Sequence, residues 1–228
     1  MLVALGFPGL AAWVYFIALA EQPAWVQGTA LAVGKLIQFG FPAVWVLAVQ
    51  RQRCRWKRPR LAGVMAGLAF GLLVFALMLA TYHAWLKPQG YLAAAGQQIT
   101  RKVSGFGVGA PPAYWAMAAF YSIPHSLLEE YYWRWFAFGQ LRRLIPWKSA
   151  ALVSSVGFMG HHVLVLGAYF GWLSLATFAF SLGVAVGGAV WCWLYQRSGS
   201  LVGPWLSHLL VDVAIFVIGY DLVGPSLV

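Results

Sequence analysis

The sequence predicts an all-α, polytopic integral membrane bundle of about seven transmembrane helices, within a range of six to eight. Hydrophobic residues make up 62% of the 228 residues and charged residues only 9%, whereas about 25% of a soluble domain is charged. Thirteen Trp and ten Tyr suit the aromatic belts found at membrane interfaces. This composition excludes a soluble domain, a disordered chain and a nucleic-acid binder, despite the net charge of +10.

Individual helices follow from apolar stretches that approach the ~20 residues needed to cross a bilayer. These stretches cover residues 3–20, 26–50, 61–83, 113–138, 150–168, 172–195 and 200–220. Their length and lack of alternation exclude transmembrane β-strands. In the long connection over 84–112, residues 91–95 favour a short interfacial helix. Pro111 and Pro112 suit the start of the following helix. Gly183 and Gly187 predict a face for close helix packing.

Basic residues predict the orientation in the membrane. The loop 51–60 holds six Lys or Arg residues, and cytoplasmic loops are enriched in such cations. Alternating helices place four more cations on the same side: Arg142, Arg143, Lys148 and Arg197. We therefore expect a multi-pass cell membrane protein with a cytoplasmic N-terminus. The loop could also contact anionic lipid head groups, although a topology anchor is the simpler interpretation. Lys35, inside the second stretch, is expected to extend to the outer interface.

Ionisable side chains inside the apolar stretches are costly, at least ~2.5–3.5 kcal/mol each near the bilayer centre. Three of the five acidic residues lie there: Glu129, Glu130 and Asp212. Four histidines lie there as well: His125, His161, His162 and His208. Such residues would be lost unless they were paired or used, so they are candidates for a functional site.

The fourth stretch separates its two glutamates by helix geometry. Glu130 and Arg134 are four residues apart and can form an ion pair on one face. Glu129 points about 100° away, and His125 lies one turn before it on the same face. Glu129 is therefore available for chemistry while Glu130 is paired.

Two further pairs share a helix face, Phe158 with His162 and His208 with Asp212. At ~1.5 Å per residue, Glu129, His162 and His208 all lie ~12–18 Å from the cytoplasmic ends of their helices. The common depth favours one shared site in the cytoplasmic half of the membrane.

The order EExxxR, FxxxH and HxxxN/D, each in a separate predicted helix, resembles the CPBP intramembrane proteases. This is the CAAX protease and bacteriocin-processing (Abi) family, which includes the type II CAAX prenyl endopeptidases. Residues 129–134, 158–162 and 208–212 carry the three motifs. The resemblance implies a catalytic core over 112–220, preceded by N-terminal helices and a connecting loop over 1–111 and followed by a short tail over 221–228.

The family resemblance implies an intramembrane endopeptidase with defined roles for the motif residues. Glu129 would be the general base that activates water, assisted by His162, while Glu130 would pair with Arg134. His208 and Asp212 would polarise the scissile carbonyl or stabilise the oxyanion.

Two histidines, His125 and His161, lie outside the family motifs. His125 could support Glu129. For both side chains, a hydrogen bond to a carbonyl one turn away or to a neighbouring helix is the simpler interpretation.

A zinc ion is a candidate cofactor, with Glu129, His162 and His208 as its ligands and an open position for water. Asp212 stands where the best-known eukaryotic members have Asn, and an ionised Asp would suit a metal or orient His208. A buried glutamate can also serve as general base without a metal. The resemblance favours this glutamate–water mechanism, and the metal question stays open.

The implied partners are the lipid bilayer and a substrate that enters from the cytoplasmic side, either a prenylated CAAX protein or a bacteriocin-like peptide. One alternative is a non-enzymatic scaffold or bacteriocin-immunity protein of the same fold. A proton-coupled transporter is a second, although no inverted repeat is visible. A haem protein is a third, and it would leave the carboxylates without a role.

Overall fold

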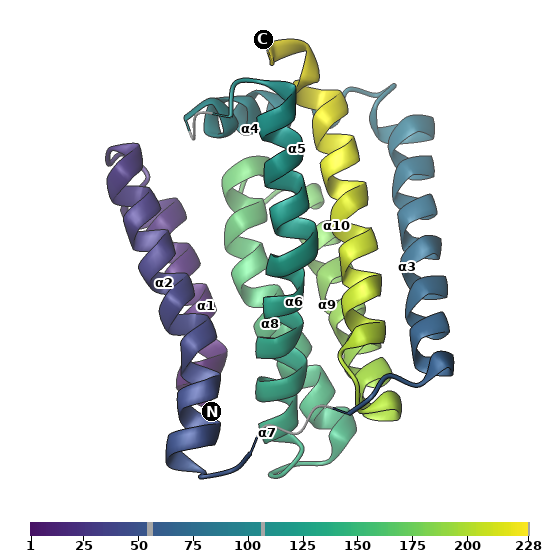
Figure 1. Cartoon of the computed structure of the whole chain (residues 1–228). Coiled ribbons are helices and arrows are strands. Elements are labelled where there is room, and N and C mark those ends of the chain that lie inside the picture. Colours follow the sequence, from purple (N-terminus) through teal and green to yellow (C-terminus); the bar gives the residue numbers. More distant parts are fainter. Residues whose placement is uncertain (54–56, 106–107, 228) are drawn as a thin grey trace. The chain divides into compact units, whose positions relative to one another are not determined.

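The computed structural model describes residues 1–53, 57–105 and 108–227. Over these ranges the chain is built from helices and contains no strand (Figure 1). The predicted all-α membrane bundle is therefore confirmed.

The long helices lie on the predicted apolar stretches. Several continue without interruption as short π-helices. Their bounds are α1 Leu2–Trp13 with π-helix Val14–Ala18, α2 Ala24–Val44 with Trp45–Val49, α3 Leu61–Thr81 with Tyr82–Leu86, α8 Trp147–Phe170, α9 Leu175–Ser198 and α10 Val202–Val223, the last followed by a short 3-10 turn at Gly224–Ser226. The predicted short helix in the long connection is α4, Ala93–Gly105.

Residues 111–141 form one further helical stretch of five consecutive segments, which we call the composite rod. It consists of α5 Pro111–Phe120, π-helix Tyr121–His125, α6 Ser126–Glu130, π-helix Tyr131–Phe138 and α7 Gly139–Leu141. Pro111 and Pro112 open it, as the sequence predicts.

Five helices of the described chain are long and apolar enough to cross a membrane: Ala24–Val49, Leu61–Leu86, Trp147–Phe170, Leu175–Ser198 and Val202–Val223. Leu2–Ala18 is apolar but shorter. The chain is a multi-pass membrane protein, and the total of seven spans stays a prediction.

The helices group into two compact units. Unit 1 comprises Met1–Arg60 and Leu128–Leu201, and unit 2 comprises Leu61–Leu127 and Val202–Val228. Each unit is described by itself.

Unit 1 is held together by packing of α8 against α9, α1 and the second π-helix of the composite rod. Ser154 on α8 donates a hydrogen bond to the Trp133 carbonyl at 3.1 Å. Ala150, Ala151 and Cys192 are buried in one core cluster with Phe138. These contacts fix α8 against the rod segment that carries Glu129 and Glu130.

Unit 2 depends on a close approach of α3 and α10. A Cβ added at Gly67 would lie 2.2 Å from the carbonyl oxygen of Gly203, so only glycine permits this contact. The C-terminal end of α10 is joined to the segment after α3 through Asp221. This carboxylate accepts a hydrogen bond from Tyr82 at 2.5 Å and pairs with Lys87 at 2.7 Å. Within unit 1, no described atom lies within 4 Å of a Cβ built at Gly183 on α9, so the close packing expected there is not formed inside that unit.

Candidate functional site

The two adjacent glutamates lie on α6, between the two π-helices of the composite rod. Pro124, within the first of them, lacks the N–H that a regular α-helical ladder would use. π-helical turns inside α-helices are frequent at functional sites. The helix type thus changes twice around the glutamate pair, from π to α before Ser126 and back to π after Glu130.

Glu130 and Arg134 form the ion pair that their spacing predicts. Arg134 Nη1 lies 3.1 Å from Glu130 Oε1, and the two side chains are 1% and 0% exposed. The guanidinium lies 4.5 Å from the ring centre of Phe158 and 4.8 Å from that of Trp191. Phe158, which lies on α8, thus packs against the buried guanidinium of Arg134. This contact joins the first two sequence motifs.

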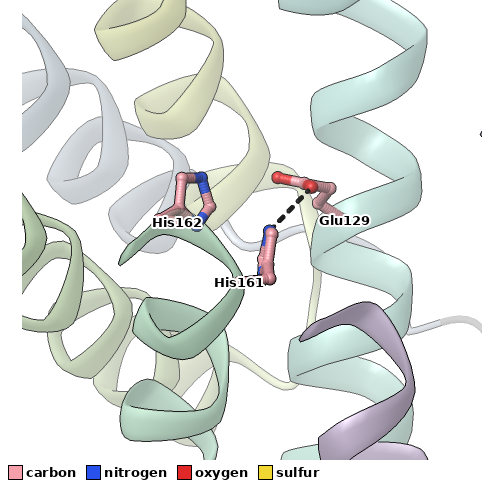
Figure 2. A group of neighbouring side chains, drawn as sticks. All are labelled: Glu129, His161 and His162. Carbon is pink, nitrogen blue, oxygen red and sulfur yellow. Dashed lines mark ion pairs between the residues drawn. The ribbon is translucent and has the colours of Figure 1, made fainter. Parts of the chain in front are cut away.

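Glu129, His161 and His162 converge in unit 1 (Figure 2). Their potential ligand atoms, one per residue, all lie within 4.8 Å of one another. His161 Nε2 is 3.6 Å from Glu129 Oε1, and the His161 ring stacks on Trp133 at an interplanar angle of 4°. A buried carboxylate therefore faces two imidazoles inside an apolar bundle.

His162 is oriented by its own helix. Its Nδ1 lies 2.9 Å from the Phe158 carbonyl oxygen. Because a carbonyl only accepts, this nitrogen must carry the hydrogen, and a neutral ring then has its lone pair on Nε2. The ring is also packed edge-on against Phe158, with 4.6 Å between ring centres.

The two neighbouring histidines make different contacts. His162 makes the bond to a carbonyl one turn away, whereas His161, for which a bond of this kind or one to a neighbouring helix was expected, faces Glu129 on another helix. His161 directs Nε2 toward Glu129, and its buried Nδ1 has no hydrogen-bond partner in the described part of the chain. The sequence offered no signal for this difference, because the rotation of α8 decides which of two adjacent residues faces the rod.

Lys35 belongs to this cluster, contrary to the expectation that it extends to the outer interface. Its Nζ lies 3.9 Å from Glu129 Oε1, and its side chain is only 29% exposed. The ammonium also lies 5.3 Å from the ring centre of Phe39. A lysine inside an apolar stretch was the available signal, but the sequence could not show which helix it faces.

The donor set suits a zinc ion, since two imidazoles and one carboxylate leave a fourth position open. The set that the structure brings together is Glu129, His161 and His162, whereas the sequence interpretation placed His208 in the third position. Lys35 already supplies a positive charge beside the same carboxylate. A bound cation would have to compete with that ammonium.

His208 and Asp212 form their own pair in unit 2. His208 Nε2 lies 3.7 Å from Asp212 Oδ1, and their side chains are 5% and 18% exposed. His125, also in unit 2, packs edge-on against Tyr121 with 5.0 Å between ring centres. The structure thus confines the Glu129 cluster to unit 1 and the His208–Asp212 pair to unit 2.

Buried ionisable residues in apolar helices define a class of polytopic membrane protein with an intramembrane polar site. Residues 111–214 match the family model described as Type II CAAX prenyl endopeptidase Rce1-like. This match confirms the resemblance to the CAAX-type intramembrane proteases that the motifs carry. The comparisons with curated proteins and with solved structures found no match.

Proposed function

We propose that this chain is an intramembrane endopeptidase in which Glu129 is the general base. The observation that carries the proposal is the buried Glu129 carboxylate beside two imidazoles and an ammonium, inside the matched family segment. A proton acceptor in a site of low polarity is what water activation at a peptide bond requires.

The reaction would proceed by attack of water on the scissile carbonyl carbon. Glu129 takes one proton from the water as its oxygen bonds to that carbon, and the carbonyl oxygen becomes an oxyanion. The C–N bond then breaks, and the proton held by Glu129 passes to the leaving amine. The products are a carboxylic acid and an amine, and Glu129 returns to its starting state.

His161, His162 and Lys35 would set the geometry of this base. Lys35 balances the carboxylate charge, and His161 restricts the carboxylate by its position 3.6 Å away. His162, with its lone pair on Nε2, can accept a hydrogen bond from the attacking water or a substrate N–H. For His208 and Asp212 we keep the oxyanion role that the family resemblance implies.

A zinc ion, if bound, would be held by Glu129, His161 and His162 and would supply Lewis acidity toward water. The substrate class that the family suggests is a peptide carried on a membrane-associated protein, prenylated or not. Entry from the cytoplasmic side follows from the predicted orientation.

The test is cleavage of a farnesylated CAAX peptide and its unprenylated twin by detergent-purified protein. Glu129→Gln should lower kcat at least a hundredfold, in line with the usual contribution of a general base. Glu21→Gln, which changes an exposed glutamate, is the matched control and should retain wild-type cleavage. Wild-type cleavage by Glu129→Gln would refute the role of the base. Failure of the active wild type to distinguish the two peptides would remove prenylation from the proposal.

A further inference from the structure

A second, basic site lies in unit 1, and neither Glu129 nor Glu130 is among its described lining residues. It is a cavity of about 480 Å³ lined by three arginines and three aromatic side chains among other residues. These six are Arg53, Arg142, Arg143, Trp135, Trp147 and Tyr195.

The cavity carries positive charge without a carboxylate among its described lining residues. Two arginines are held by neutral amides instead, because Arg142 Nη1 donates to Gln196 Oε1 at 2.6 Å and Arg143 Nη2 donates to Gln52 Oε1 at 3.0 Å. An amide orients a guanidinium without cancelling its charge, so the cavity retains its attraction for an anion.

Neighbouring contacts fix the wall of the cavity. The Arg142 guanidinium lies 5.4 Å from the ring centre of Phe138 and 6.0 Å from that of Tyr195. Gln50 and Gln140 exchange hydrogen bonds of 2.8 and 3.1 Å between their amides. Guanidinium groups held in this way can bind two oxygens of a phosphate group through paired N–H donors.

We propose that this cavity binds the phosphate of an anionic phospholipid head group. It is formed where helices end and where the basic loop after α2 begins, on the side that the charge distribution predicts to be cytoplasmic. Trp135 and Trp147 line it, and tryptophan is enriched at the level of lipid head groups. The cytoplasmic leaflet carries the anionic lipids that attract such basic segments.

The experiment measures lipid binding to the full chain in detergent by native mass spectrometry, with phosphatidylglycerol and zwitterionic phosphatidylcholine as probes. We expect each arginine that contacts the bound phosphate to contribute about fivefold in affinity, the scale of one cation at an anionic lipid surface. Arg142→Gln/Arg143→Gln should therefore bind phosphatidylglycerol about 25-fold more weakly. Arg58→Gln/Arg60→Gln, which removes two exposed cations outside the cavity, should bind it like the wild type. Arg53→Gln alone should lose about fivefold, which keeps the test valid if the double variant fails to fold.

Equal losses in both double variants would show that only general surface charge attracts the lipid, and this would overturn the proposal. Equal binding of both lipids by the wild type would overturn it as well. Inorganic phosphate distinguishes the two sources of the ligand. Displacement of phosphatidylglycerol by millimolar phosphate would assign the cavity to a free phosphate, whereas retention of the lipid would assign it to the head group. Retention of the lipid is the result expected, and its displacement would overturn the assignment to a lipid.

Discussion

The buried Glu130–Arg134 pair gives the sharpest prediction of stability. Arg134→Met removes the cation and leaves a carboxylate that is 0% exposed in the structure. Breaking a buried ion pair by removing one partner costs about 3–5 kcal/mol. The lost contacts of the guanidinium with Phe158 and Trp191 act in the same direction. We therefore expect the free energy of unfolding to fall by about 4 kcal/mol.

The assay is unfolding of the purified protein in mixed micelles of mild detergent and SDS, followed by far-UV circular dichroism. Adding Glu130→Gln to Arg134→Met should recover a large part of the loss, because no buried charge is then left unpaired. Arg197→Met, which changes an exposed arginine at the end of α9, is the control and should change stability by less than about 1 kcal/mol. If Arg134→Met cost less than about 1 kcal/mol, or if the double variant lost the sum of the two single effects, the buried pair would not be coupled as argued.

Three further predictions test other parts of the structure. Gly67→Val should destabilise unit 2 by more than about 2 kcal/mol, because its Cβ would overlap the opposing backbone. Gly183→Val, at a position with open space, is the control and should be near neutral. Equal midpoints of SDS unfolding for the two variants would contradict the packing argument. Lys35→Met should lower kcat at least tenfold while Lys35→Arg keeps part of the activity, and a change in KM alone would assign Lys35 to substrate binding instead. Asp221→Asn should cost only about 1 kcal/mol, because the Asp221 side chain that accepts from Tyr82 and pairs with Lys87 is partly exposed. It should leave the kcat of peptide cleavage unchanged, so a lower kcat would give this helix-end contact a part in catalysis.

Much of the fold follows from the sequence because a membrane constrains each helix separately. Every backbone group in lipid must be satisfied within its own helix, so length and hydropathy suffice to locate the helices. The same locality explains why the Glu130–Arg134 pair could be predicted. Four residues along one helix fix the distance between two side chains, whatever that helix packs against.

Contacts between helices required the tertiary structure. Adjacent residues on a helix point about 100° apart, so the sequence could not tell that both His161 and His162 lie beside Glu129. The stacking of His161 on Trp133 and the hydrogen bond of Ser154 to the Trp133 carbonyl set that rotation. For the same reason the close packing occurs at Gly67 and not at Gly183.

The sequence alone determined an all-α membrane protein, its ionisable residues and the family to which their order points, because these depend on local composition and spacing. Only the tertiary structure decided that Lys35 faces Glu129 and that Arg142 and Arg143 line a cavity held by neutral amides. These contacts join residues 54 to 94 positions apart along the chain. Their formation depends on how each helix is rotated and packed, which hydropathy does not encode.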